Sequence, residues 1–99
     1  MRAAVVAVAA ALSPPLALAD ELGKKVFTSV AQPSCALCHT LEAAGAKGKL
    51  GPSLDELKPD EARALKAIKQ GVGVMPSYAD NLSPEEIAAV ARYVAESVR

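Results

Sequence analysis

Residues 35–39 read Cys35-Ala36-Leu37-Cys38-His39 and place two thiols three positions apart, directly followed by an imidazole. The 99-residue chain contains no other cysteine and no other histidine. A disulfide between cysteines this close would stabilise the fold little, because in the chain-entropy account stabilisation grows with the loop that the bond closes. The motif therefore needs an explanation other than a structural disulfide.

Cys-x-x-Cys-His is the sequence that attaches a c-type haem. Two thiols at this spacing on a short helical turn can both reach one edge of a porphyrin, and the imidazole that follows then lies beneath the iron. A thioredoxin-like dithiol normally accompanies a βαβ pattern, and a zinc site needs a fourth soft ligand; the sequence offers neither. The motif therefore favours one covalent haem c on Cys35 and Cys38, with His39 as an axial ligand.

Residues 1–19, MRAAVVAVAAALSPPLALA, have the features of a secretory signal peptide: one positive charge at Arg2, an apolar run over residues 3–12 and a small-residue end. The apolar run is about half as long as the roughly twenty residues that span a membrane. We expect cleavage near Ala19-Asp20, export to the periplasm and no membrane span in the mature chain. A retained membrane anchor is the alternative.

The second axial ligand has few candidates once the signal peptide is removed. Met75 is then the one methionine, and it lies in Gly71-Val72-Gly73-Val74-Met75-Pro76, a loop sequence rather than an apolar helical stripe. Ligation by His39 and Met75 is the prediction, and this pair raises the reduction potential of electron-transfer haems. A core-filling methionine, or an open or water-ligated iron, are the alternatives.

The mature chain, residues 20–99, is predicted to form one domain, because about eighty residues bury a single thin core. Its aromatic residues are one Phe and two Tyr, with no Trp, so a large apolar cofactor would fill the centre. Without Arg2, ten of the eleven basic residues remain against eleven acidic ones. This balance removes the usual electrostatic case for nucleic-acid binding.

Apolar spacing predicts helices over residues 20–31, over residues 60–70 and from Ser83 to the end of the chain. The first helix is expected to bury a stripe of Leu22, Val26 and Val30. No stretch alternates for long enough to predict a strand, so the expected class is all-α.

The helix near the end of the chain has the clearest start. Ser83 is a typical N-cap, Pro84 suits the first helical position, and Glu86 completes a capping box. Its apolar stripe consists of Ile87, Val90, Ala91, Val94 and Val98, with Tyr93 at the edge. These signals predict a long helix with one buried face.

Taken together, these features resemble class I cytochrome c. The residues that carry the resemblance are Cys35 to His39, Gly51-Pro52-Ser53-Leu54 and Met75-Pro76, set between a first helix with Gly23 and Phe27 and a last helix with Tyr93. The resemblance covers essentially all of residues 20–99. It implies three to four helices around one covalently bound haem.

The resemblance also implies roles for individual residues. The backbone carbonyl of Pro52 should accept the Nδ1 proton of His39, which would fix the imidazole. Gly23 and Phe27 should face Val90 and Tyr93 where the first and last helices cross closely. Tyr78 is expected either to hydrogen-bond a haem propionate or to pack with its hydroxyl at the surface.

Residues 31–78 are also similar to the small haem subunits of bacterial sulfite dehydrogenases, whose larger subunit contains molybdenum. This similarity implies a protein that accepts single electrons from the molybdenum subunit and passes them to a downstream cytochrome. The chain alone is not expected to be an enzyme, because the sequence predicts no nucleophile, acid–base pair or open metal position. The alternatives are a freely diffusing shuttle to a terminal oxidase or reductase, and ligand-binding or peroxide chemistry at an open distal site. A subunit should show an apolar patch around the haem edge, and a shuttle should not.

Overall fold

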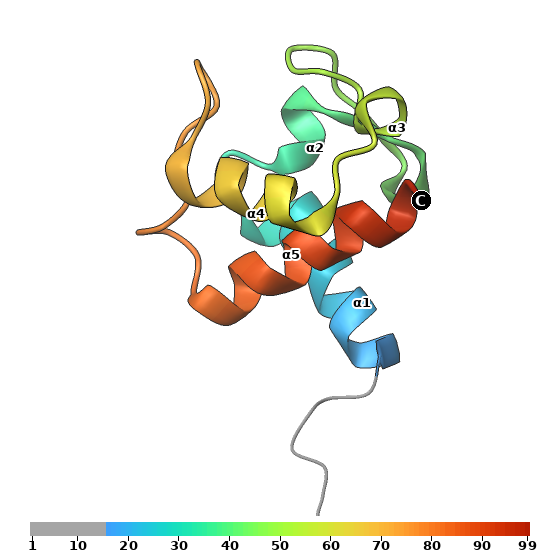
Figure 1. The fold of residues 1–99 in the computed structure, drawn as a ribbon, viewed down its shortest axis with the longest axis vertical. Coiled ribbons are helices and arrows are strands. Elements are labelled where there is room, and N and C mark those ends of the chain that lie inside the picture. The colour runs from blue at the N-terminus through green and yellow to red at the C-terminus, as the bar shows by residue number, and fades with distance from the viewer. Residues whose placement is uncertain (1–15) are drawn as a thin grey trace, which may run out of the picture.

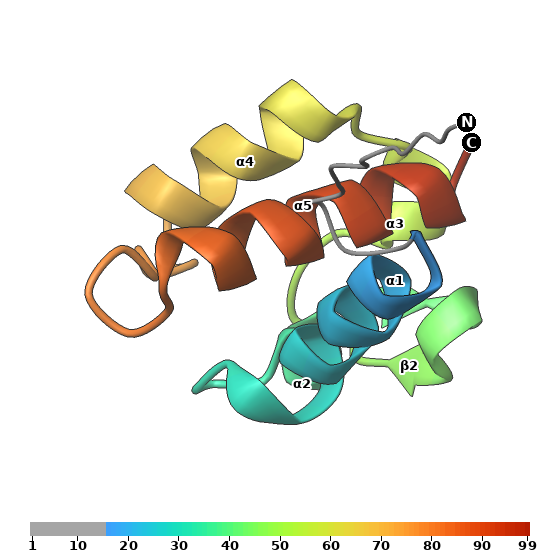
Figure 2. The same ribbon diagram turned by 90° about the horizontal axis from the view of Figure 1, so that it is seen from below.

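Three long helices form the frame of the protein (Figure 1). The computed structural model describes residues 16–99, and the long helices are α1 (Leu16–Lys25), α4 (Glu61–Gln70) and α5 (Pro84–Ser97). Helix α5 packs against both α1 and α4, and Figure 2 shows it between them. Two single-turn helices, α2 (Cys35–Cys38) and α3 (Leu54–Leu57), complete the α-helices of the described chain. Within these residues no helix is long and apolar enough to cross a membrane.

A short antiparallel ribbon corrects one detail of the all-α prediction. Strands β1 (Thr40–Leu41) and β2 (Ala46–Lys47) pair with Leu41 opposite Ala46, and a 3-10 turn, η2 (Glu42–Ala44), joins them. Strands of two residues are too short for an alternating pattern, so periodicity could not reveal them. The class remains all-α, because this ribbon is small beside the helices.

The first helix begins earlier than the sequence predicts, and it buries only part of the predicted stripe. It begins at Leu16 rather than Asp20, so it also includes the last four residues of the predicted signal peptide. Residues 1–15 lie outside the described chain. Leu and Ala are strong helix formers, which accounts for the earlier start. The helix continues into a π-helical segment, η1 (Val26–Val30). Of the predicted stripe, Val26 is buried, Val30 is half-buried and Leu22 is 36% exposed. Gly23 and Phe27 complete the buried side.

Helices α1 and α5 cross at Gly23, as the resemblance implied. A Cβ atom on Gly23 would clash with Cβ of Tyr93 and would lie 2.6 Å from the carbonyl oxygen of Ala89. One turn further on, the rings of Phe27 and Tyr93 meet edge to face, with centroids 6.3 Å apart. Glycine therefore lets the two backbones approach, and the aromatic pair closes the contact.

The capping box predicted at the start of α5 is confirmed. The Ser83 hydroxyl accepts a hydrogen bond from the Glu86 backbone N–H at 3.1 Å, and the Glu86 carboxylate accepts one from the Ser83 N–H at 2.9 Å. The predicted face is buried as expected, with Val90 1% and Ala91 0% exposed. Local chemistry thus fixes where the central helix begins.

We expect Ser83→Ala to lower the free energy of unfolding by about 1 kcal/mol, because it removes the side-chain half of this capping box. Denaturant unfolding of the mature protein, followed by far-UV circular dichroism, measures the change. Ser29→Ala is the matched control, since Ser29 is exposed and its hydroxyl only bonds back to the Lys25 carbonyl within the helix. Equal losses in the two variants would contradict the assigned role of Ser83.

Helix α4 also has the ends that the sequence predicts. The Asp60 carboxylate accepts a hydrogen bond from the Arg63 backbone N–H at 2.8 Å, and Gly71 ends the helix with φ +79°. A left-handed residue here is most easily a glycine. Gly71 turns the chain into the loop of residues 71–78, which contains Met75.

Candidate functional site

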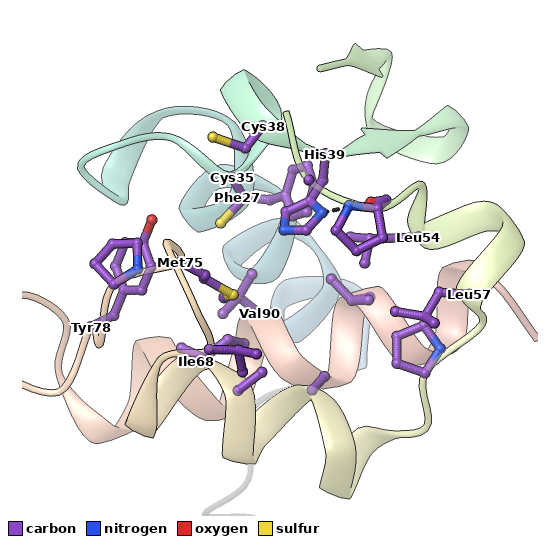
Figure 3. A pocket seen from close by; sticks show the side chains of 18 of the residues that line it. Phe27, Cys35, Cys38, His39, Leu54, Leu57, Ile68, Met75, Tyr78 and Val90 are labelled. Atoms are coloured by element: carbon purple, nitrogen blue, oxygen red, sulfur yellow. Dashed lines mark hydrogen bonds between the residues drawn. The ribbon is translucent and has the colours of Figure 1, made fainter. Parts of the chain in front are cut away.

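A cavity of about 380 Å³ brings together all six residues singled out in the sequence. Its lining includes Cys35, Cys38, His39, Pro52, Met75 and Tyr78. The remaining walls are mainly apolar side chains from η1, α3, α4 and α5, among them Phe27, Leu54, Ile68 and Val90 (Figure 3). Segments that are far apart in the sequence therefore converge on one apolar space with a few donor groups.

The two cysteines lie on the single-turn helix α2, whose position is fixed by Ser34. The Ser34 hydroxyl accepts a hydrogen bond from the Ala36 N–H at 3.2 Å, capping the helix. The same hydroxyl lies 3.1 Å from the carbonyl oxygen of Phe27, to which it can donate. Figure 3 shows the two sulfur atoms directed to the same side. Helix α2 is thus tied to η1 and presents both thiols to a single ligand edge.

The Cys35 thiol is not prepared for thiol-redox chemistry. Burial is the main reason that its pKa is raised to about 11; a backbone hydrogen bond opposes this increase, and the neighbouring Cys38 adds to it. Redox dithiols work through a thiolate whose pKa is lowered. At neutral pH Cys35 is a protonated thiol.

His39 is held by Gly51 and Pro52, which come a few residues after the ribbon of residues 40–47. Its Nδ1 lies 2.7 Å from the carbonyl oxygen of Pro52. A carbonyl only accepts, so Nδ1 carries the proton and Nε2 keeps a lone pair for a metal. A Cβ atom on Gly51 would lie 2.8 Å from Cε1 of the ring, so the backbone at Gly51 packs directly on the imidazole. The Gly51 N–H in turn donates to the Cys38 carbonyl at 2.7 Å.

Met75 is presented by a tight loop. The backbones of Val72 and Met75 exchange two hydrogen bonds, of 3.0 and 2.8 Å. A Cβ atom on Gly71 would lie 2.8 Å from the Met75 carbonyl oxygen, which leaves room for glycine alone at this turn. Figure 3 shows the Met75 sulfur in the cavity with His39, each reaching it from a different segment.

Tyr78 has a partner that neither sequence expectation included. Its side chain is 5% exposed, and its hydroxyl donates to the backbone carbonyl of Pro33 at 2.7 Å. Burial is the main reason that its pKa is raised to about 12; the thiols of Cys35 and Cys38 add to the increase, and thioether formation removes that addition. The hydroxyl is therefore protonated at physiological pH and available as a donor.

The donor set and the lining of this cavity fit a covalently attached haem. An imidazole with a free Nε2, a thioether, two thiols on one turn and apolar walls are the groups that a c-type haem requires. Among residues 16–99, no three or more His, Cys, Asp or Glu side chains come together in a group that could hold a metal ion. The arrangement suits a porphyrin better than a bare metal.

Comparison with known proteins agrees with this fit. The family described as cytochrome c oxidase, cbb3-type, subunit III matches residues 19–94. The chain belongs to this cytochrome c family. No curated protein matches it. The crystal structure of the c-type cytochrome SorU from Sinorhizobium meliloti is similar to this cytochrome, with 46% sequence identity and a TM-score of 0.80 over 83% of this chain and 93% of that one. The fold is that of a class I cytochrome c, the cofactor is covalent haem c, and the activity is electron transport.

Exposed apolar side chains surround the mouth of the cavity, and sequence reasoning did not identify them. This apolar rim consists of Leu50, Leu57, Val72 and Val74. Leu50 is 79% exposed and Val74 99%. Both lie in glycine-containing loops with no periodicity, so no sequence pattern indicated that they belong to one surface. These side chains come together beside the cavity only in the folded protein.

Proposed function

We propose that this cytochrome is the haem subunit of a molybdenum-containing sulfite dehydrogenase. It accepts single electrons from the catalytic subunit, passes them to a downstream cytochrome and catalyses no reaction by itself. Bound haem supplies the redox chemistry by alternating between its ferrous and ferric states. The proposed domain is residues 20–99, exported to the periplasm after cleavage of residues 1–19.

The residues of the cavity have separate tasks in this proposal. Cys35 and Cys38 form the thioether bonds, so the cofactor cannot dissociate outside the cytoplasm. His39 and Met75 are the two axial ligands, and the Pro52 carbonyl orients the imidazole and strengthens it as a donor. Tight backbone packing at Gly51 and Gly71 limits movement of both ligands. Ligands that stay in place between redox states keep the reorganisation energy low.

The apolar rim is the observation that supports a subunit rather than a shuttle. Contiguous exposed apolar surface on a small protein usually marks an interaction site. Here four exposed apolar side chains line the cavity that would hold the haem, where an electron has the shortest path out of the protein. The similarity of residues 31–78 to small haem subunits of sulfite dehydrogenases supports the same partner. We therefore propose that the catalytic subunit docks on the surface of this cytochrome that contains Leu50, Val72 and Val74.

Gentle size-exclusion chromatography of extract from the native host tests this proposal. Haem absorbance, molybdenum and sulfite-dependent haem reduction are followed across the fractions. We expect haem to elute with a much larger molybdenum-containing polypeptide and to be reduced by sulfite. Haem that elutes alone and is not reduced by sulfite in any recombined fractions would contradict the proposal and favour a shuttle. Rapid binding of cyanide or carbon monoxide would instead favour chemistry at an open distal site.

We expect Val74→Glu to lower the rate of haem reduction by the catalytic subunit on the order of tenfold, because a buried interface charge without a partner is costly. Stopped-flow reduction by the purified catalytic subunit with sulfite measures the rate. Ala88→Glu is the matched control, since Ala88 is exposed on α5 and does not line the cavity. If the two variants are equally fast, the docking face lies elsewhere.

A further inference from the structure

The loop of residues 71–78 is fastened almost entirely to helix α4. Its backbone and side-chain hydrogen bonds run to the end of that helix or stay near the loop. They include Gly71 N–H to Ala67 O (2.8 Å), Tyr78 N–H to Ile68 O (2.8 Å), Ser77 hydroxyl to Lys69 O (2.6 Å) and the Val72–Met75 pair. These bonds fix the shape of the loop relative to α4. They do not fix its distance from the segment that contains His39.

One hydrogen bond of this loop crosses to the other side of the cavity. The Tyr78 hydroxyl donates to the Pro33 carbonyl at 2.7 Å, over a separation of 45 residues. Among residues 16–99 it is the only hydrogen bond that joins the loop of residues 71–78 to the Cys-x-x-Cys-His side of the cavity. Pro33 stands two residues before Cys35, at the entry to α2. Figure 3 shows Tyr78 on the same side of the cavity as Met75, with its hydroxyl directed away from the loop.

The surroundings of this bond make it worth more than an exposed one. Tyr78, which supplies the donor, is almost fully buried, whereas Pro33 is exposed, so the bond is partly shielded from water. Removal of the hydroxyl therefore costs about the net free energy of one partly buried hydrogen bond. The bond therefore opposes outward movement of the loop.

We propose that Tyr78 is a positioning residue for the axial ligand: its hydroxyl fastens the Met75 loop to the backbone before α2 and so keeps Met75 at the iron. This inference rests on Met75 as ligand, which is part of the proposed function. The hydroxyl joins the loop that contains Met75 to the segment that contains His39. Loosening it should allow Met75 to leave without unfolding the protein.

Exogenous imidazole measures how often Met75 leaves. It binds the ferric iron only when the methionine is displaced, so its apparent dissociation constant varies inversely with the fraction of protein whose loop is open. Tyr78→Phe keeps the ring and removes only the hydroxyl. We expect the apparent dissociation constant of imidazole to fall about three- to tenfold in this variant, the factor that one net hydrogen bond represents. The titration is monitored by the loss of the methionine-to-ferric charge-transfer band.

Tyr93→Phe is the matched control, because it removes the other tyrosine hydroxyl. The Tyr93 hydroxyl is buried at the α1–α5 crossing, and within the described residues it has no hydrogen-bond partner. We expect its imidazole affinity to equal that of the unmodified protein. Denaturant unfolding of both variants is measured alongside, so that a general loss of stability is recognised.

Three results would overturn the inference. One is an unchanged imidazole affinity and an unchanged reduction potential in Tyr78→Phe, with or without a lower unfolding midpoint, which would make the bond structural only. Another is an equal change in both tyrosine variants. The third is a shifted reduction potential with unchanged imidazole affinity, which would instead indicate a propionate contact. If Met75→Ala leaves the charge-transfer band intact, the ligand assignment itself fails, and this outcome is distinct from the other three.

Discussion

Replacement of Met75 by alanine should abolish the methionine-to-ferric charge-transfer band and lower the reduction potential by a few tenths of a volt, within the roughly 0.8 V that axial ligands span. A thioether stabilises ferrous iron more than ferric iron, so its loss favours the oxidised state. The protein should also bind cyanide and carbon monoxide quickly, because one axial position becomes accessible. Absorption spectroscopy and potentiometric titration measure these changes.

A control on the same loop separates ligation from loop structure. Val74 precedes Met75, and its side chain is 99% exposed. Val74→Ala should therefore leave both the band and the potential unchanged. An unaltered band in Met75→Ala would remove Met75 as a ligand. A band lost in both variants would mean that it reports loop conformation rather than the methionine.

Local chemistry made the ends of α4 and α5 predictable. Ser83, Glu86 and Asp60 cap backbone groups within three residues of themselves, and Gly71 takes up a left-handed conformation directly after its helix. Such contacts depend on neighbours in the sequence and hardly on the rest of the fold. The Cys-x-x-Cys-His motif is equally local, so the cofactor also followed from the sequence.

Features that depend on distant contacts were not predictable. The buried face of α1 is set by the crossing at Gly23, and Leu22 lies outside this face. The partner of the Tyr78 hydroxyl lies 45 residues away, on a carbonyl that has no side-chain signal. The contact of Pro52 with His39 was expected only from resemblance to a family. In each case the tertiary arrangement decides which of several local possibilities is realised.

We expect Gly23→Ala to lower the free energy of unfolding by about 2–3 kcal/mol and the melting temperature by roughly 10 °C or more. The new Cβ would lie 2.6 Å from the carbonyl oxygen of Ala89, which is backbone and cannot rotate away. The intrinsic gain of alanine over glycine in a helix, at most about 1 kcal/mol, does not offset this clash. Relief requires α1 and α5 to move apart, which also loosens the contact between Phe27 and Tyr93.

Thermal unfolding of the mature holoprotein measures the effect of Gly23→Ala, with Lys24→Ala as control on the exposed side of the same helix. Lys24→Ala should stay within about 0.5 kcal/mol of the unmodified protein. Since neither Gly23 nor Tyr93 lines the cavity, the charge-transfer band should persist in folded Gly23→Ala. An unchanged melting temperature would show that the crossing can widen at little cost. Loss of the band at temperatures where the helices remain folded would mean that the α1–α5 crossing positions the axial ligands as well as stabilising the domain.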